Sequence, residues 1–250
     1  MLSNYSMNFP PKIATIEKDQ LPRHVVIIPD GNRRFATERG LLPWEGHEAG
    51  AKNTEKLIQE ARSIGIREFS LWGSSLENLI KRPLAERQAL LRIYEAYFKK
   101  LLTSEDIHKD KLRIRFIGHW EEQFPATLKT VMYECIEATK NYDKYFLNFF
   151  LAYSGDDEMR LAIQKIAETL APGQTVTDAM IKANLMTHEL PPVDLLIRTG
   201  GEPHLSAGFM MWDIANTQLY FSEKYYPDFD EASFREAIAD YAKRGRRFGQ

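Results

Sequence analysis

The sequence predicts a single α/β domain in which a central, mostly parallel sheet is covered by helices on both faces. Short apolar runs without polar alternation recur along the chain, as in strands that are buried on both sides. Segments with apolar residues at helical spacing separate these runs. Strands that alternate with helices are joined by crossover connections, and this arrangement favours parallel pairing.

Six strands are expected. The first, His24–Ile28, is a continuous apolar and β-branched run after its histidine. Comparable runs lie at residues 69–72, 112–117, 146–153, 193–197 and 210–221.

Helices are expected between these strands. Apolar residues at three- and four-residue steps give residues 54–64 one apolar face, and Gly65 is typical of a helix end. A second helix follows Pro83, which is favourable in a first turn. Further helices are expected over residues 125–139, 156–170 and 178–185, and from the N-cap Asp230 to about residue 244.

Composition excludes several classes of protein. The 250 residues are 44% hydrophobic and 27% charged, as in ordinary globular domains. Lys and Arg total 33 against 35 Asp and Glu, so no overall basic field would recruit nucleic acid. The single cysteine, Cys135, cannot form an intrachain disulfide and fits a reducing compartment.

No targeting or membrane segment is expected. Residues 1–20 lack a basic start followed by a long apolar run, and no apolar run approaches the roughly 18 residues of a membrane span. We therefore expect a cytoplasmic protein with a flexible N-terminal arm over residues 1–21 and one domain over residues 22–250.

Small and polar residues follow four of the expected strands, where ligands bind in open α/β sheets. These segments are PDGNRR (29–34), GSS (73–75) with EN (77–78), SGD (154–156) and RTGGE (198–202). Glycines permit close backbone approach, and arginines pair with phosphate oxygens. The pattern predicts a site for a phosphorylated ligand, at which Asp30 is the carboxylate placed to hold Mg²⁺.

Each feature also has a purely structural interpretation. Asp-Gly-Asn is a common turn, Arg198 can be a surface cation at a strand end, and His47 can cap a helix. A stripe with Tyr94 and Phe98 belongs more often to a core than to a ligand tunnel. The coincidence of several such loops at one predicted edge favours a binding site.

These residues resemble the cis-prenyltransferases, the undecaprenyl diphosphate synthase family, over about residues 21–249. The matching stretches are HVVIIPDGNRR (24–34), GHEAGA (46–51), EN (77–78) with RP (82–83), PVDLLIRTGGE (192–202) and LYF (219–221). The resemblance implies a homodimer with a hydrophobic substrate tunnel. It also implies a Mg²⁺-dependent transferase that condenses an allylic diphosphate with isopentenyl diphosphate and releases pyrophosphate.

The resemblance assigns roles by position. Asp30 would bind Mg²⁺ and assist departure of the allylic diphosphate. The residues assigned to that diphosphate are Gly31, Asn32, Arg34 and His47, with Arg33 and Phe35 beside them. Those near the reacting centre are Ser75, Asn78 and Arg82, and those at the second diphosphate are Arg198, His204 and Ser206. Arg247 and Gly249 match a C-terminal element that reaches a neighbouring subunit.

The chemistry suits these residues. Cleavage of the allylic carbon–oxygen bond leaves a carbocation and pyrophosphate, whose developing charge needs preorganised cations and metal. No strong nucleophile is needed, so the lack of a nucleophile signature is no objection.

The sequence also departs from the family pattern. Pro29, Arg33, Phe35 and Pro43 stand where the family usually has Met, Gly, Trp and Arg. His204 replaces a usual arginine, Gln218 replaces a glutamate of the metal site, and one residue is inserted around Ala207-Gly208. Arg33 can replace the missing allylic-side cation. These changes suggest altered substrate geometry, for which a head-to-middle (branched) coupling is the alternative to ordinary elongation.

Bulky residues predict a short or medium product. Phe146, Phe149 and Phe150 lie on the fourth expected strand, and Tyr94, Tyr97 and Phe98 on the helix after Pro83. The family's tunnel is framed by these two elements, and a crowded tunnel stops chain growth early. The enzyme would contact a membrane peripherally when it releases its product.

Two other classes of function are less favoured. A non-catalytic partner subunit would be expected to lose the first-loop aspartate, whereas Asp30 is present. A nucleotide-binding kinase or dehydrogenase would carry G-x-x-x-x-G-K-[ST] or G-x-G-x-x-G, and neither pattern occurs.

Overall fold

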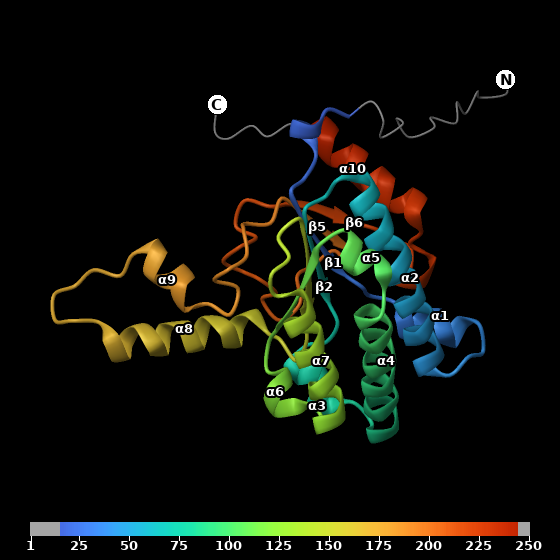
Figure 1. Cartoon of the computed structure of the whole chain (residues 1–250), viewed down its shortest axis with the longest axis horizontal. Coiled ribbons are helices and arrows are strands. Elements are labelled where there is room, and N and C mark those ends of the chain that lie inside the picture. The colour runs from blue at the N-terminus through green and yellow to red at the C-terminus, as the bar shows by residue number, and fades with distance from the viewer. Residues whose placement is uncertain (1–15, 245–250) are drawn as a thin grey trace.

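The computed structural model describes residues 16–244, which form a six-stranded sheet in the order β3-β4-β2-β1-β5-β6 (Figure 1). The strands are β1 (His24–Ile28), β2 (Glu68–Trp72), β3 (Leu112–Ile117), β4 (Tyr145–Phe150), β5 (Leu195–Arg198) and β6 (Gln218–Phe221). All five neighbouring pairs are parallel. The predicted parallel α/β domain is confirmed. The chain builds the sheet first on one side of β1 and then on the other, so the carboxyl end of β1 is the expected ligand position.

Ten α-helices and two short 3₁₀ helices connect the strands within the described residues. The α-helices are α1 (Asn32–Glu38), α2 (Pro43–Ile64), α3 (Leu76–Lys81), α4 (Leu84–Leu102), α5 (Glu105–Lys109), α6 (Trp120–Gln123), α7 (Ala126–Thr139), α8 (Gly155–Thr169), α9 (Asp178–Asn184) and α10 (Glu231–Arg244). The 3₁₀ helices are η2 (Lys18–Gln20) and η3 (Tyr226–Asp228). The helices expected from periodicity are present. Those that were not predicted, α1, α3, α5 and α6, are too short to show a periodic apolar face.

Two strands are shorter than predicted. The expected strand over residues 146–153 ends at Phe150, because Ala152 takes a φ of 50° and turns the chain out of the sheet. The expected strand over residues 210–221 begins only at Gln218, and Met210 has a φ of 49° within a series of turns. Positive φ is incompatible with a strand, and an apolar run alone does not reveal it.

Four long helices bury one face of the sheet: α2, α4, α7 and α10. Val25 and Ile27 of β1 pack in one core with Leu57 of α2, Phe98 of α4 and Phe234 of α10, all nearly inaccessible to solvent. Figure 1 shows α2 and α4 side by side and α10 beyond them.

The other face is covered differently from the prediction of helices on both sides. Its apolar core joins Val26 and Leu196 to Phe209 and Met210, and its buried residues come from strands and from irregular segments rather than from helices. Helices α8 and α9 instead project away from the sheet (Figure 1). Half of this sheet face is polar, and within residues 16–244 its apolar half is covered by irregular segments.

A buried polar row makes up that half. His24 Nε2 lies 2.8 Å from Ser70 Oγ, and Asn148 Nδ2 donates to both Ser70 Oγ and Glu68 Oε1. Arg115 donates to the same Glu68 oxygen at 2.9 Å. Burial raises the pKa of Glu68, whereas its partners Asn148 and Arg115 favour the charged form. The row is a hydrogen-bonded network across neighbouring strands, as buried polar groups require.

None of the helices within residues 16–244 is long and apolar enough to cross a membrane.

Because burial lowers the pKa of His24 to about 4, the folded protein should lose stability in acid. Above pH 6.5 the histidine is neutral in both states. Between pH 6.5 and 4 only the unfolded chain binds the proton, so the free energy of unfolding falls, by about 2 kcal/mol from pH 7 to pH 5. The variant His24→Gln should show a smaller difference between urea midpoints at these two pH values.

The matched control is His108→Gln, which changes an exposed histidine and should keep the full pH dependence. An unchanged pH dependence in His24→Gln would contradict a neutral, buried His24.

Candidate active site

The loop after β1 is shaped by Gly31. This residue has a φ of 97°, and a Cβ there would lie 2.6 Å from the Tyr225 ring. Glycine is therefore required where α1 begins. The Gly31 amide donates to Asp30 Oδ1 at 2.6 Å and directs the carboxylate toward the loop after β5.

Asp30 connects the loop after β1 with the loop after β5. Arg198, only 5% exposed, donates from Nη2 to Asp30 Oδ2 at 2.8 Å. The half-exposed Arg34 lies 3.4 Å from Asp30 Oδ1 and 3.3 Å from Glu202. The structure thus brings Asp30, Arg34 and Arg198 together, as the sequence predicted. Asp30 and Glu202 together balance these two guanidinium groups, so excess positive charge for an anion must come from the further arginines of the site.

A second group of polar side chains links α2 to α4. Arg82 Nη1 lies 2.9 Å from His47 Nε2 and donates to Glu86 Oε1 at 2.6 Å. Because a guanidinium only donates, His47 Nε2 must accept and the ring is neutral. Burial, followed by the charge of Arg82, lowers the pKa of His47 to about 4. Arg33 lies 3.7 Å from the same Glu86 oxygen.

Glu86 was missed by the sequence analysis. Its carboxylate is almost fully buried and lies among Arg33, His47 and Arg82, so it fixes where the two arginines point. The only available signal was its position in the first turn of the helix that follows Arg82 and Pro83.

These residues line a recess of about 440 Å³. Its lining consists of Pro29, Asp30, Gly31, Asn32, Arg33, Arg34, Thr37, His47 and Arg82. It therefore contains most of the residues assigned to the allylic diphosphate, and Thr37 in addition. Phe35 is not among them, since its ring lies under the Arg39 guanidinium.

An apolar cavity of about 70 Å³ continues from this recess. Pro29, Asn32 and His47 line both spaces. The cavity then runs between α2, α4 and the sheet to Phe98 and Phe149. The combination of a cationic recess and an apolar cavity fits a ligand with an anionic head and a hydrocarbon tail.

Glycines allow α1 to pack closely on α2. A Cβ at Gly46 would lie 2.0 Å from the Asn32 carbonyl oxygen, and one at Gly50 would lie 2.3 Å from Asn32 Oδ1. Asn32 Nδ2 donates to the Pro29 carbonyl, whereas Oδ1 is buried without a hydrogen-bond partner among the described residues. The close packing places Asn32 where the recess meets the cavity.

The residues predicted near the reacting centre have mixed positions. Ser75 is buried and caps α3 by accepting from the Asn78 amide at 3.0 Å, so its hydroxyl serves the local fold. The Asn78 residue is exposed. Arg82, described above, lines the recess.

The loop with His204 and Ser206 is held by its own backbone and by an aromatic anchor. Arg198 Nη1 donates to the His204 carbonyl at 2.5 Å, whereas the His204 ring is exposed. Phe209 inserts next to Trp72 and Phe150, with ring centroids 4.8 and 5.0 Å apart. Ala207 and Met210 take φ values of 46° and 49°, a strained backbone at the predicted insertion.

A buried network that the sequence did not reveal supports this loop. The Tyr153 hydroxyl lies 2.5 Å from Glu158 Oε2 and accepts from the Met210 amide at 3.3 Å. Glu158 Oε1 accepts from the Thr187 amide. Burial raises the pKa of Glu158. The base of α8 is thereby connected to the loop after β5.

Of the remaining predicted residues, one is not brought to Asp30 and two cannot be placed. Gln218 of β6 pairs with Leu195 of β5, and Leu195 pairs with Val25 of β1. Gln218 therefore lies level with Val25, toward the amino ends of the strands, whereas Asp30 comes five residues after Val25. Its Oε1 is buried without a partner among the described residues. Its metal role stays a prediction. Arg247 and Gly249 lie outside the described residues.

The donor set fits Mg²⁺ only together with a phosphorylated ligand. Residues 16–244 contain no group of three or more His, Cys, Asp or Glu side chains that could hold a metal ion. Mg²⁺ is commonly bound by one or two carboxylates plus substrate phosphates. Asp30, with a side chain 34% exposed beside the recess, can supply the carboxylate.

Comparison with known proteins decides the family. A prenyltransferase family model described as "Putative undecaprenyl diphosphate synthase" matches residues 28–249. The chain belongs to this family. It is a prenyl-transferring enzyme, as the resemblance of its motifs predicted.

Several relatives of this prenyltransferase match along nearly all of the chain. A tritrans,polycis-undecaprenyl-diphosphate synthase (geranylgeranyl-diphosphate specific) from Methanocaldococcus jannaschii is 37% identical, over 94% of this chain and 85% of the relative. An isoprenyl transferase from Shouchella clausii is 38% identical, over 94% and 91%. Lavandulyl diphosphate synthase from Lavandula x intermedia, crystallised with dimethylallyl diphosphate, superposes with a TM-score of 0.84 at 31% identity, over 93% of this chain and 100% of that one.

The pairing of Asp30 with Arg34 and Arg198 predicts opposite effects of Asp30→Asn with and without metal. Without Mg²⁺, inorganic pyrophosphate should bind the variant severalfold more tightly, because the repelling carboxylate is gone and both arginines are released. With Mg²⁺, the parent should gain affinity and the variant should not. Isothermal titration calorimetry measures all four affinities.

Glu202→Gln is the matched control, since it releases Arg34 but keeps the Asp30 carboxylate. It should retain the gain in affinity with Mg²⁺. A full metal-dependent gain in Asp30→Asn would exclude Asp30 as the metal-binding carboxylate.

Proposed function

We propose that this prenyltransferase condenses an allylic diphosphate with isopentenyl diphosphate and releases pyrophosphate. The single observation that supports this reaction is the continuity between the cationic recess beside Asp30 and the apolar cavity between α2 and α4. A diphosphate head and a hydrocarbon tail need these two environments in this order.

In the proposed reaction the allylic carbon–oxygen bond breaks and pyrophosphate keeps the electron pair. The double bond of isopentenyl diphosphate then forms a carbon–carbon bond to the allylic carbocation, and a proton is lost from the adduct. The residues proposed to bind and orient the departing diphosphate are Gly31, Arg34, His47 and Arg82. Mg²⁺ held by Asp30 and the diphosphate oxygens would neutralise charge on the leaving group.

The neutral state of His47 suits this role. An imidazole that accepts from Arg82 through Nε2 presents its Nδ1–H as a donor. We propose that this group donates to a diphosphate oxygen in the recess. Arg33, which lines the recess with a side chain 62% exposed, would supply the cation that Pro43 does not provide.

The second diphosphate is proposed to bind at the loop after β5. Arg198 has its Nη1 on the His204 carbonyl and its Nη2 on Asp30, so it lies between the two sites. Ser206 would contribute a hydroxyl from the same loop. An exposed imidazole at His204, in place of a guanidinium, gives this site weaker anion binding than is usual in the family.

We propose a short or medium product. The names of the archaeal relatives specify an undecaprenyl product, so this inference depends on the cavity of this chain. Tyr97, Phe98 and Phe149 close its inner end, and their ring centroids lie 5.1 to 6.0 Å apart. We propose that this aromatic cluster blocks further isoprene units unless a side chain moves.

A branched coupling is the second candidate. The similarity to lavandulyl diphosphate synthase favours it, together with the altered loop around His204 and the strained Ala207 and Met210. In that case the carbon–carbon bond would join an internal carbon of the acceptor. Since the acceptor's position depends on where its diphosphate binds, this loop decides the linkage.

We also propose a cytoplasmic homodimer. Helices α8 and α9 project from the body, and Ile163 on α8 is 61% exposed, as expected of an element that packs on a second copy (Figure 1). Residues Arg247 and Gly249 would then reach the neighbouring site. The buried thiol Cys135, which packs in the core, is compatible with a reducing compartment.

The purified chain alone, incubated with Mg²⁺, dimethylallyl diphosphate and isopentenyl diphosphate, should form a prenyl diphosphate. Mass spectrometry gives its length, and NMR gives its double-bond geometry and distinguishes a linear from a branched skeleton. Asp30→Ala should lower kcat about 10²–10³-fold, the effect of removing one electrostatic group from an active site. The control Asp143→Ala changes an exposed carboxylate before β4.

No turnover by the parent would support the non-catalytic subunit instead. Undiminished turnover by Asp30→Ala would contradict the proposed site, and linear products alone would exclude the branched coupling.

A further inference from the structure

A groove on the outer side of α2 and α4 lies next to the apolar cavity. It has a volume of about 430 Å³, compared with about 70 Å³ for the cavity itself. Ala51 of α2 and Ile93 and Tyr97 of α4 line both spaces. These three side chains therefore lie between the apolar cavity and the larger groove.

We propose that this outer groove is a second binding site for the prenyl chain, and that the Tyr97 side chain decides whether the chain enters it. The inference rests on the proposed prenyl transfer, because its ligand is the tail of the enzyme's own product. Tyr97 is then a residue that determines product length.

Tyr97 is suited to move. Its ring contacts the aromatic cluster at the inner end of the cavity, with centroids 5.9 Å from Phe98 and 6.0 Å from Phe149. Its hydroxyl is buried and has no hydrogen-bond partner among the described residues. Outward rotation therefore breaks no hydrogen bond and lets the hydroxyl reach water, which offsets part of the lost ring packing.

The groove combines apolar lining residues, which suit a hydrocarbon chain, with charged ones. Its lining includes small side chains from both helices, Ala51, Ala89 and Ala96, together with Ile93 and Trp44. Apolar side chains of this kind would bury part of a prenyl tail.

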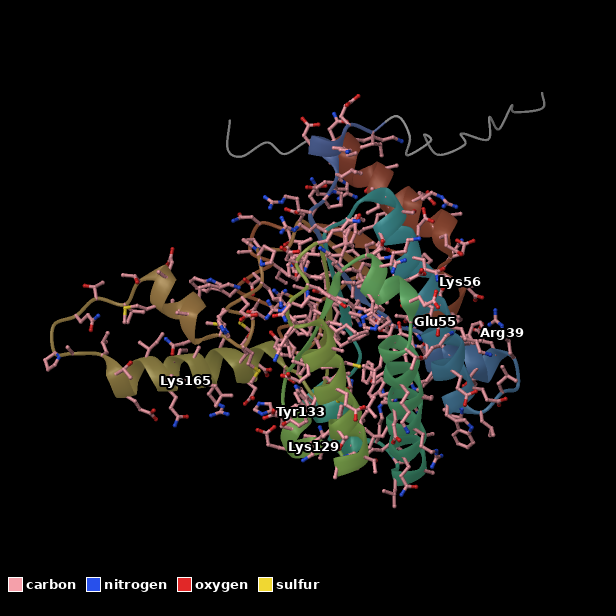
Figure 2. The ribbon with its side chains drawn as sticks, viewed as in Figure 1. Arg39, Glu55, Lys56, Lys129, Tyr133 and Lys165 are labelled. Atoms are coloured by element: carbon pink, nitrogen blue, oxygen red, sulfur yellow. The ribbon has the colours of Figure 1, made fainter. Side chains whose placement is uncertain are left out.

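Charged side chains form the rim. At the end away from the recess, Lys100 of α4 lies 2.5 Å from Glu55 of α2, so an ion pair bridges the two helices. Figure 2 labels Glu55 on α2, near the C-terminal end of α4. The ion pair limits the groove, and a chain that passes Tyr97 would lie beneath it with its diphosphate still in the recess.

The continuity with the cavity favours the prenyl chain over any other occupant. A peptide or a soluble metabolite would reach the groove only from solvent. Its binding would not depend on Ile93 and Tyr97 also lining the inner cavity. A growing tail, in contrast, is pushed against these two side chains from inside with each added isoprene unit.

The test compares four variants by product length, measured after incubation with isopentenyl diphosphate and either dimethylallyl or geranylgeranyl diphosphate. Tyr97→Ala removes the ring between the cavity and the groove and should lengthen the main product by one or more isoprene units. It should also raise kcat/KM for geranylgeranyl diphosphate relative to dimethylallyl diphosphate. Ala96→Trp fills the exposed groove and should leave the parent's product unchanged.

The double variant Tyr97→Ala/Ala96→Trp carries the proposal. If the added length lies in the groove, the tryptophan should return the product to parental length. If the double variant still makes the longer product, the extra chain occupies the inner cavity and the groove is not a binding site. Unchanged length in an active Tyr97→Ala variant would equally overturn the role of Tyr97.

Tyr97→Phe guards against loss of fold. It removes a hydroxyl without a partner and keeps the ring, so thermal stability and product length should match the parent. A large fall in its stability would show that the hydroxyl is bonded and that outward rotation is hindered. An inactive parent enzyme would contradict the proposed prenyl transfer. The product lengths described above test the groove and Tyr97, and they are compared only among variants that are active.

Discussion

The contact between Asp30 and Arg198 is the interaction on which the site depends. It joins the loops after β1 and β5, two neighbouring strands of the sheet, through a guanidinium that is almost completely buried. A buried charge is stable only when it is paired and hydrogen-bonded. Arg198 satisfies this with Asp30 on one amino group and the His204 carbonyl on the other. Removal of the carboxylate would leave an unpaired cation that an anionic ligand could then pair.

The arginines of the recess are also paired with carboxylates. Arg33, Arg34 and Arg82 all reach it, and Glu86 or Glu202 lies against each of them. The carboxylates hold the arginines in place before ligand arrives, so less conformational entropy remains to be lost on binding. His47 is kept neutral by burial and by Arg82, and it therefore provides a hydrogen bond without adding charge.

The two faces of the sheet are covered by different kinds of structure. Helices α2, α4, α7 and α10 make one continuous apolar core, and the cavity opens between α2 and α4 within it. The second face is half polar and half covered by the segment around Phe209. A loop that packs into the core through an aromatic side chain is more rigid than a loop on the surface. The proposed second diphosphate site is thus held in place by core packing.

The sequence alone determined the parallel α/β architecture, most helices, and the residues that meet at Asp30, because apolar periodicity and loops at strand ends are local properties. It did not reveal Glu86 as the partner of Arg82, the polar row of His24 and Glu68, or the end of β4 at Phe150. Partners far apart in the chain and positive φ values leave no local pattern. The volume beside Tyr97 was decided only by how α2 and α4 pack, since a cavity is what the side chains of separate elements leave unfilled.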